Sequence, residues 1–391
     1  MTYDFDRVTQ RRGTDSVKWS VAEGELPMWV ADMDFQTAPE ILEALQRRLD
    51  HGIFGYATIP ESWYDAYIGW WQRRHGFRLE RDALLFCTGV VPAISSVIRA
   101  LTAPDAAVVL QTPVYNMFFR NATDNGRRVA ENPLCYRDGA YTVDFADLEA
   151  KLADPRTEAM ILCNPHNPIG KLWDAPTLER IGALCLKHHV LVISDEIHCD
   201  LTLPGRGYIP FASVSAACRD NSITCLAPTK TFNLAGLHSA ALSVPDREIR
   251  RRVQQALHTD SLAEPGSFAV CAAEAAYGQG APWLDALRDY LAENRRRVAE
   301  FLAAEVPGVR LVAGEATYLL WLETGLPSRA LAAFLRARTG LFVTAGAVYG
   351  APGDRFLRMN VACPRSVLED GLRRLQEGMA AWTREKGENG A

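Results

Sequence analysis

The middle of the sequence alternates short apolar runs with helical stretches. Such a chain builds a mostly parallel sheet covered by helices on both faces. The carboxyl ends of parallel strands form one edge, and ligands of these sheets bind there. We therefore predict an α/β fold with its site at that edge, and the strands are expected at residues 83–87, 107–110, 159–163, 190–194, 222–226 and 239–244.

A chain of 391 residues is too long for one typical core, so we expect two domains. The pattern changes near Pro282, where a long helix is predicted over residues 283–304 before further strands. A last helix is expected to open with the capping box Ser366-Val367-Leu368-Glu369. The predicted organisation is an N-terminal arm with part of the small domain at 1–45, a large cofactor-binding domain at 46–285 and a smaller α/β C-terminal domain at 286–391.

Composition excludes several classes of function. A formal net charge of -5 argues against a nucleic-acid partner, which needs a clustered excess of Lys and Arg. No apolar run reaches the ~20 residues of a membrane span, and the first residues lack the order of a signal peptide. The nine cysteines form no CxxC pair, which is typical of reduced cytoplasmic thiols.

Two pairs of residues offer a weaker, metal-binding interpretation. Cys163 with His166, and His198 with Cys199, have side chains that can bind zinc. Structural zinc sites use closely spaced, repeated ligand pairs that this sequence lacks. We therefore expect no metal site.

Polar residues follow three of the predicted strands. Asn164 comes after 159–163, Asp195 after 190–194, and Lys230 after 222–226. A lysine at the end of a buried strand is partly desolvated, which lowers its pKa and makes the amine a usable nucleophile at neutral pH. This position suits a Schiff-base lysine, with the other two side chains beside it.

A fourth segment suits a phosphate group. Thr88-Gly89-Val90-Val91 follows a predicted strand and opens a helix, so that free backbone N–H groups and the helix dipole face an anion. Strand–Gly–helix turns are common and most bind nothing. We interpret this segment as a phosphate site because the three polar residues are expected at the same edge of the sheet.

One cofactor needs this set of groups, namely pyridoxal 5'-phosphate. Its aldehyde needs a lysine, its phosphate needs a helix start, and its ring nitrogen needs an acid that keeps the ring protonated. We expect Lys230 in the first role and an ionised Asp195 in the last. Asn164 can donate to the phenolic oxygen, and Tyr115 can lay its ring on the pyridine face.

Four motifs carry a resemblance to a known family. They are N-P-H-N-P-x-G at 164–170, S-D-E-I-H at 194–198, T-K-T-F-N-x-A-G-L at 229–237 and P-M-W-V-A-D-M-D-F at 27–35. Together they resemble the fold-type I, class I/II aminotransferase superfamily, and in particular its cystathionine β-lyase, or C–S lyase, branch (MalY/PatB type). The resemblance runs from about residue 3 to residue 383 and implies the PLP-dependent transferase fold.

The resemblance implies a role for each motif residue. Arg358 matches the arginine that clamps the substrate α-carboxylate, a task suited to a bidentate guanidinium. Tyr56 matches a tyrosine that reaches the phosphate of the neighbouring subunit, which implies a homodimer with shared sites. The implied cofactor contacts are Gly89, Val90, Val91, Tyr115, Asn164, Asp195, His198, Thr229, Lys230 and Tyr56, and the implied substrate contacts are Arg358, Ala31, Tyr115 and Asn164.

Two positions depart from the aminotransferase pattern. His198 stands three residues after Asp195, where many transaminases carry a tyrosine. His238 stands eight residues after Lys230, where transaminases often place a phosphate-binding arginine. The phosphate is then expected to depend more on backbone amides and hydroxyls.

The expected activity is α,β-elimination on L-cystathionine or an S-substituted L-cysteine, giving thiol, pyruvate and ammonia. Lys230 would take the Cα proton as general base. Whether elimination or transamination takes place depends on the orientation of the Cβ–S bond, which the sequence does not reveal. A class I/II aminotransferase is therefore the alternative, and a non-catalytic regulator on the same fold is a third. The thioether substrate and any protein partner stay open.

Overall fold

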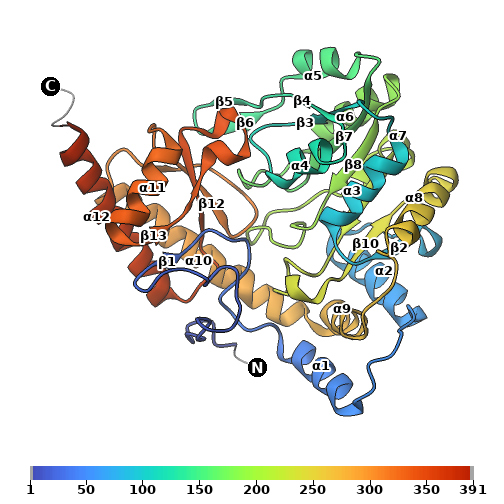
Figure 1. Cartoon of the computed structure of the whole chain (residues 1–391), viewed down its shortest axis with the longest axis horizontal. Coiled ribbons are helices and arrows are strands. Elements are labelled where there is room, and N and C mark those ends of the chain that lie inside the picture. Colours follow the sequence, from blue (N-terminus) through green and yellow to red (C-terminus); the bar gives the residue numbers. More distant parts are fainter. Residues whose placement is uncertain (1–2, 388–391) are drawn as a thin grey trace.

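The computed structural model describes residues 3–387 and contains a large part built on a seven-stranded sheet and a smaller part built on a second sheet (Figure 1). Strand β10 is antiparallel to both of its neighbours, and the remaining pairs are parallel. This confirms the predicted fold class. The order is β2 (Leu84–Cys87), β10 (Ala240–Ser243), β9 (Ser222–Leu226), β8 (Leu191–Asp195), β7 (Thr157–Cys163), β3 (Ala107–Leu110) and β4 (Arg128–Glu131).

Alternate residues of the central strands enter two separate cores. Ile161 and Ile193 pack on one face of the sheet, whereas Met160 and Val192 pack on the other. A strand with both faces covered is apolar at every position, which is why these segments read as continuous apolar runs. One core includes residues of α3 (Val90–Leu101), α4 (Met117–Thr123) and α8 (Arg247–Thr259), and the other includes residues of α5 (Phe145–Leu152), α6 (Ala175–Lys187) and α7 (Ala216–Asp220).

An aromatic core joins two helices that precede the central sheet in sequence to one helix that follows it. Trp63, Tyr67, Trp70 and Trp71 of α2 are buried against Tyr277 and its neighbours. The Tyr67 and Tyr277 rings meet edge to face, with centroids 4.7 Å apart. The helices concerned are α1 (Pro39–His51), α2 (Glu61–His75) and α9 (Ser267–Gln279).

The long helix α10 (Ala281–Glu305) leads into the smaller part (Figure 1). There, α11 (Ser328–Thr339) and α12 (Arg365–Gly387) share a core with the second sheet. That sheet has the order β11 (Arg310–Leu311), β12 (Leu319–Glu323), β15 (Phe356–Asn360) and β14 (Thr344–Ala345). Two further pairs are β1 (Leu26–Pro27) with β13 (Leu341–Phe342) and β5 (Cys135–Arg137) with β6 (Ala140–Thr142).

Several predicted boundaries differ from the observed ones by one or two residues, and two of these differences bear on the analysis. Helix α12 begins at Arg365, so Ser366 lies within the first turn and the predicted capping box does not open the helix. The Pro364 carbonyl instead accepts the N–H groups of Val367 and Leu368. Strand β8 extends one residue further than expected and ends at Asp195 itself. The domain limits at residues 45 and 285 stay a prediction.

Residues 28–35, which we call the N-terminal strap, connect the two parts of the molecule. Asn360 of β15 donates through Nδ2 to the carbonyls of Val30 and Asp32, both at 2.6 Å. Asn233, in the loop after β9, accepts the N–H of Met33 at 2.9 Å and donates to its carbonyl at 3.0 Å. The strap is therefore fixed to the small sheet and to the Lys230 loop at the same time.

Buried charges hold the strap to the residues that precede it. Asp34 accepts from Lys18 Nζ at 2.8 Å, from Arg11 Nη1 at 2.7 Å and from Trp19 Nε1 at 2.8 Å. Lys18 is only 1% exposed. A buried cation of this kind is tolerated because its partner carboxylate is in place.

Within residues 3–387, no helix combines the length and the apolar character that crossing a membrane requires. The nine cysteines are all unpaired, and seven of them are buried.

We predict that Asp34→Ala lowers the free energy of unfolding by about 3–5 kcal/mol, because the buried Lys18 ammonium would lose its close carboxylate and keep only the longer contact with Asp32, at 3.9 Å. Urea unfolding at matched protein concentration measures this. Glu248→Ala is the control, since Glu248 forms only an exposed pair with Arg251, and it should leave the midpoint unchanged. Equal midpoints for both variants would contradict the structural importance of Asp34.

Candidate active site

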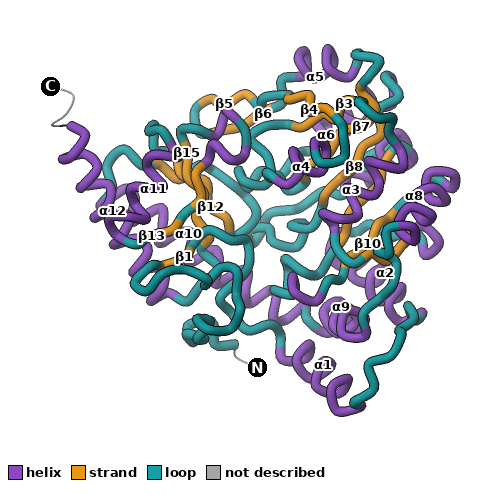
Figure 2. Tube along the Cα trace, viewed as in Figure 1, coloured by secondary structure: helices purple, strands orange, loops and turns teal. Residues whose placement is uncertain are grey.

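Three strand ends meet at the carboxyl edge of the central sheet. In the parallel register Cys163 lies opposite Asp195, and Asp195 lies opposite Cys225. The Asn164 N–H donates to the Asp195 carbonyl at 2.9 Å. The loops that follow these strands fill the region between the two sheets (Figure 2). The predicted edge is therefore real, and it faces the smaller part of the molecule.

Lys230 is half-buried in the loop after β9, and its Nζ donates to the Ala31 carbonyl of the strap at 2.7 Å. Burial lowers the pKa of its amine to about 8, and the Arg358 charge lowers it further, while Asp32 and Asp195 act in the opposite direction. A substantial fraction of the amine is therefore neutral slightly above pH 7. These interactions also place Lys230, Asp195 and Arg358 in one electrostatic neighbourhood.

Asp195 is buried at the end of β8, where its Oδ1 accepts the N–H of Ile197 at 3.3 Å. Burial raises the pKa of its carboxyl to about 7, against the opposing influence of the Ile197 N–H and the Lys230 charge. The sequence predicts an ionised Asp195. In these surroundings ionisation at neutral pH is only partial, and a cation facing the carboxylate is needed to complete it.

Two buried polar atoms near Asp195 have no hydrogen-bond partner among the described residues. Asn164 donates through Nδ2 to the Ile209 carbonyl at 3.0 Å, but its Oδ1 is unpaired. His198 is buried with an unpaired Nδ1. Burial lowers the pKa of His198 to about 3, and the charges of Lys230 and Arg358 act in the same direction, so its imidazole is neutral. Buried polar groups normally have partners, so these atoms mark a place for a polar ligand.

The predicted phosphate seat begins helix α3. Gly89 is the N-cap residue, and no side chain caps this helix end. The N–H groups of the first turn, which include Val90 and Val91, therefore point out of the helix towards an anion. A Cβ at position 89 would lie 3.3 Å from the Pro92 ring, a tight contact that glycine avoids. Thr229 is half-buried in the Lys230 loop.

Arg358 lies in β15 and is only 5% exposed. Its Nη2 donates to the Trp29 carbonyl at 2.8 Å, its Nη1 to Asn167 Oδ1 at 3.3 Å, and its Nε is unpaired. Its guanidinium also lies over the Tyr349 ring, 4.9 Å from the centroid. No carboxylate among residues 3–387 pairs with this buried cation, which suits it to bind an incoming carboxylate.

The two tyrosines differ in their relation to the site. Tyr115 is half-buried; burial raises the pKa of its hydroxyl, and the charges of Arg358 and Asp195 also act on it, so it belongs to this neighbourhood. Tyr56 is fully exposed and lines a groove of about 640 Å³ together with Thr88 and His238. The groove reaches the residue before Gly89, but the predicted contact of Tyr56 with a second subunit stays a prediction.

Several contacts of the site were not predicted from sequence. The Tyr318 hydroxyl donates to the Ala31 carbonyl at 3.0 Å, beside the Lys230 amine. Trp29 contributes only its carbonyl to Arg358, and a backbone carbonyl leaves no signal in a sequence. Asn167 belongs to the N-P-H-N-P motif, so its contact with Arg358 is the one that the motif itself could have suggested.

One of the two pairs weighed for zinc, Cys163 with His166, has other partners. His166 is buried, with Nε2 2.9 Å from the Pro113 carbonyl, and the Cys163 thiol lies 3.5 Å from the Pro165 carbonyl. In the described part of the chain, one group of three potential ligands has its atoms within 4.8 Å of one another, namely His75, Cys199 and Asp200. It lies outside the site described here.

The site combines an amine that is partly neutral near pH 7, a buried carboxylate, an uncapped helix start and an arginine without a carboxylate partner. Asn164, with its unpaired Oδ1, is joined to Asp195 through the backbone, and His198, with its unpaired Nδ1, follows Asp195 by three residues. These donors and acceptors fit an aromatic aldehyde phosphate such as pyridoxal 5'-phosphate, with an amino acid as the second ligand.

Comparison with known proteins gives the same picture. The model of the family "Aminotransferase class I and II" matches residues 26–375. Cystathionine beta-lyase PatB of Bacillus subtilis is 45% identical over 96% of this chain and 100% of its own length. Cystalysin of Treponema denticola, whose crystal structure contains a pyridoxal 5'-phosphate cofactor, has a TM-score of 0.94 and 32% identity over 97% of this chain and 100% of its own. The PLP-bound C-S lyase of Staphylococcus hominis has a TM-score of 0.90 and 29% identity over 97% of this chain and 98% of its own.

We predict that the Lys230 amine, in protein freed of cofactor, titrates near pH 8 rather than at the ordinary 10.5, because burial disfavours its charged form. The rate of acetylation of Lys230 by acetic anhydride, followed by peptide mass spectrometry, should therefore rise through a midpoint near pH 8. A midpoint above pH 10 would show that the amine is solvated and would contradict the desolvation described above.

Proposed function

The chain belongs to the class I and II aminotransferase family, and on that premise we propose that it is a PLP-dependent C–S β-lyase of the cystathionine β-lyase type. Its reaction is the α,β-elimination of L-cystathionine or an S-substituted L-cysteine to a thiol, pyruvate and ammonia. The observation that carries this proposal is the buried Arg358, which pairs with no carboxylate among residues 3–387 and lies in the electrostatic neighbourhood of the Lys230 amine. That pair fits an α-amino acid held by its carboxylate beside a reactive amine.

The residues that would hold the cofactor follow from their chemistry. Lys230 supplies the amine for the aldehyde, and Asp195 faces the ring nitrogen. A protonated ring nitrogen is the cation that Asp195 needs, because burial alone raises the pKa of this carboxyl to about 7. Tyr115 would stack on the ring, with Asn164 and His198 near the phenolic oxygen. The phosphate contacts are assigned to Gly89, Val90, Val91 and Thr229.

When bound, PLP withdraws electrons from the Cα of the amino acid and so makes its proton removable. We assign the removal of that proton to Lys230 Nζ. Its pKa of about 8 lies close to neutrality, which favours a group that must both accept and release a proton. The Ala31 carbonyl accepts from this Nζ at 2.7 Å and fixes the direction of the amine.

Arg358 would bind the substrate α-carboxylate and thereby orient Cα. Its guanidinium is held by the Trp29 carbonyl and by Asn167, so that little side-chain freedom is lost when a substrate binds. Elimination breaks the Cβ–S bond, the thiolate leaves with the electron pair, and water releases pyruvate and ammonia. The similarity to the Bacillus cystathionine beta-lyase and the Staphylococcus C-S lyase supports this outcome over amino-group transfer.

A homodimer with shared sites is the proposed assembly. The segment that carries Tyr56 also exposes Ile53 and Phe54, and the neighbouring helix α1 exposes Leu42 and Leu49. Apolar side chains gathered on one surface region suit a protein interface. Cytoplasmic localisation is proposed on the nine unpaired cysteines, which a reducing compartment would leave in that state.

We predict that the purified protein is yellow and releases pyruvate from L-cystathionine, because the bond to the β-sulfur is the one that breaks. A coupled lactate dehydrogenase assay on a panel of S-substituted cysteines measures the rate and identifies the preferred thioether. Lys230→Ala should lose both the cofactor absorbance bound to the lysine and the pyruvate release. Exchange of amino groups with a keto acid, without pyruvate release from any cysteine thioether, would instead assign the chain to the aminotransferases.

We predict that Arg358→Ala lowers kcat/KM roughly 30- to several thousand-fold, because a substrate carboxylate would lose its buried partner. This corresponds to a loss of about 2–5 kcal/mol in transition-state stabilisation. Arg358→Lys should recover only part of the activity, since an ammonium cannot form the two-pronged contact. Steady-state kinetics with a fixed thioether measure both variants. Arg355→Lys, at an exposed residue just before β15, is the matched control and should behave as the parent does. Normal kcat/KM in Arg358→Ala would contradict the assignment.

A further inference from the structure

A second polar cavity, which we call the arginine pocket, lies away from Lys230 and Arg358. Its volume is about 360 Å³. Arg73, Arg74 and His75 reach it from the end of α2, Arg206 from the segment after β8, and Arg288 from α10. Three segments that are distant in sequence thus direct four guanidinium groups at one cavity.

The guanidinium groups outnumber the carboxylates that pair with them. Asp285 serves both Arg74, at 2.8 Å, and Arg288, at 3.6 Å. Arg73 donates to the Tyr277 carbonyl at 3.1 Å and pairs with no carboxylate in residues 3–387. Burial lowers the pKa of Arg288 and the Arg74 charge lowers it further, whereas the carboxylates of Asp285 and Asp200 act in the opposite direction. The cavity therefore carries like charges that an anion would relieve.

The remaining cation is held only loosely. Arg206 pairs with Glu315 at 3.5 Å, and both side chains are partly exposed. Arg288, in contrast, is fixed in direction, because its Nε donates to the Thr202 carbonyl and its Nη2 to Thr202 Oγ1, both at 2.9 Å. The pocket therefore contains one guanidinium that is fixed, that of Arg288, and one that can adjust to a ligand, that of Arg206.

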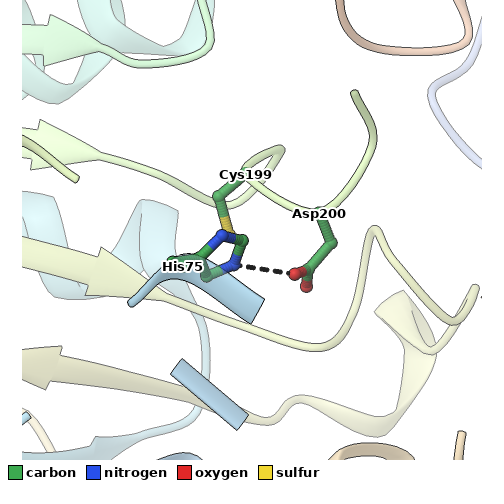
Figure 3. Close-up of side chains that lie close together, drawn as sticks. All are labelled: His75, Cys199 and Asp200. Carbon is green, nitrogen blue, oxygen red and sulfur yellow. Dashed lines mark hydrogen bonds and ion pairs between the residues drawn. The ribbon is translucent and has the colours of Figure 1, made fainter. Parts of the chain in front are cut away.

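The carboxylate at the floor of the pocket already accepts several hydrogen bonds, which leaves no place for a metal ion. Asp200 accepts from His75 Nε2 at 2.9 Å (Figure 3), from Trp70 Nε1 at 3.0 Å and from Thr231 Oγ1 at 2.9 Å. Burial and the carboxylates of Asp200 and Glu196 raise the pKa of the Cys199 thiol well above its ordinary value. A metal would require the thiolate, so the His75, Cys199 and Asp200 group is a hydrogen-bonded floor rather than a metal site.

We propose that the arginine pocket binds a compact anion with two or more negative charges, such as a phosphate, a diphosphate or a short dicarboxylate. Guanidinium groups bind phosphate and carboxylate oxygens in pairs, which is the geometry that several converging arginines offer. The anion joins α2, the segment after β8 and α10. It therefore stabilises the junction where α10 leaves the large part of the molecule.

Isothermal titration calorimetry of the PLP-saturated protein at low ionic strength tests this proposal. Pyrophosphate, inorganic phosphate and succinate are titrated separately, so that the three arms distinguish phosphoryl from carboxylate ligands. At least one should bind, with an affinity that falls as salt is added. Saturation with PLP keeps the phosphate seat at α3 from taking up the probe.

The variant Arg74→Gln/Arg206→Gln should weaken the binding at least 10-fold. Arg120→Gln/Arg156→Gln removes the same charge from two exposed arginines elsewhere and should leave the affinity unchanged. Arg206→Gln alone, which breaks only the long contact with Glu315, should weaken binding several-fold and serves if the double variant does not fold. Lack of binding by all three probes, or equal affinities in all variants, would overturn the proposal. The outcome does not depend on the lyase activity.

Discussion

The parallel register of β7, β8 and β9 decides where the chemistry of this protein takes place. Each strand ends at the same level, so the residue that follows one strand lies beside the end of the next. The edge also buries its charged groups, since Asp195 is only 4% and Arg358 only 5% exposed. Burial then shifts the pKa values of Lys230 and Asp195 towards neutrality from opposite sides, to about 8 and about 7. The strand register thus determines both where the Lys230 and Asp195 side chains lie and how reactive they are.

Much of this edge could be predicted from the residues. Apolar runs buried on both faces are easy to recognise, and polar residues at their ends point to a shared site, which is why Asn164, Asp195 and Lys230 were identified. Strand β4 was not predicted, because Arg128 and Glu131 at its two ends are exposed and its pattern is polar. The capping box at Ser366 was wrong because the helix begins one residue earlier, at Arg365, and the Pro364 carbonyl accepts the N–H groups of Val367 and Leu368 in its first turn.

The contacts that complete the site are of a kind that sequence patterns do not carry. Ala31 and Trp29 act through their carbonyls, so that their side chains give no signal for the contacts with Lys230 and Arg358. Those carbonyls are in position only because Asn233 and Asn360 fix the strap, over separations of about 200 and about 330 residues. The position of Arg358 beside Lys230 likewise depends on how the two sheets meet, and local periodicity says nothing about that.

Burial has different consequences for the two groups of cations in this molecule. Arg358 is held by neutral carbonyl and amide oxygens, which satisfy its donors without cancelling its charge, and the charge therefore stays available to a carboxylate. In the arginine pocket the guanidinium groups share few carboxylates. The excess positive charge is therefore spread over several arginines and is not located on one residue. Asp200 lies between the pocket and the Lys230 loop. Its hydrogen bonds with His75 and Thr231 therefore connect the floor of the pocket to the Lys230 loop.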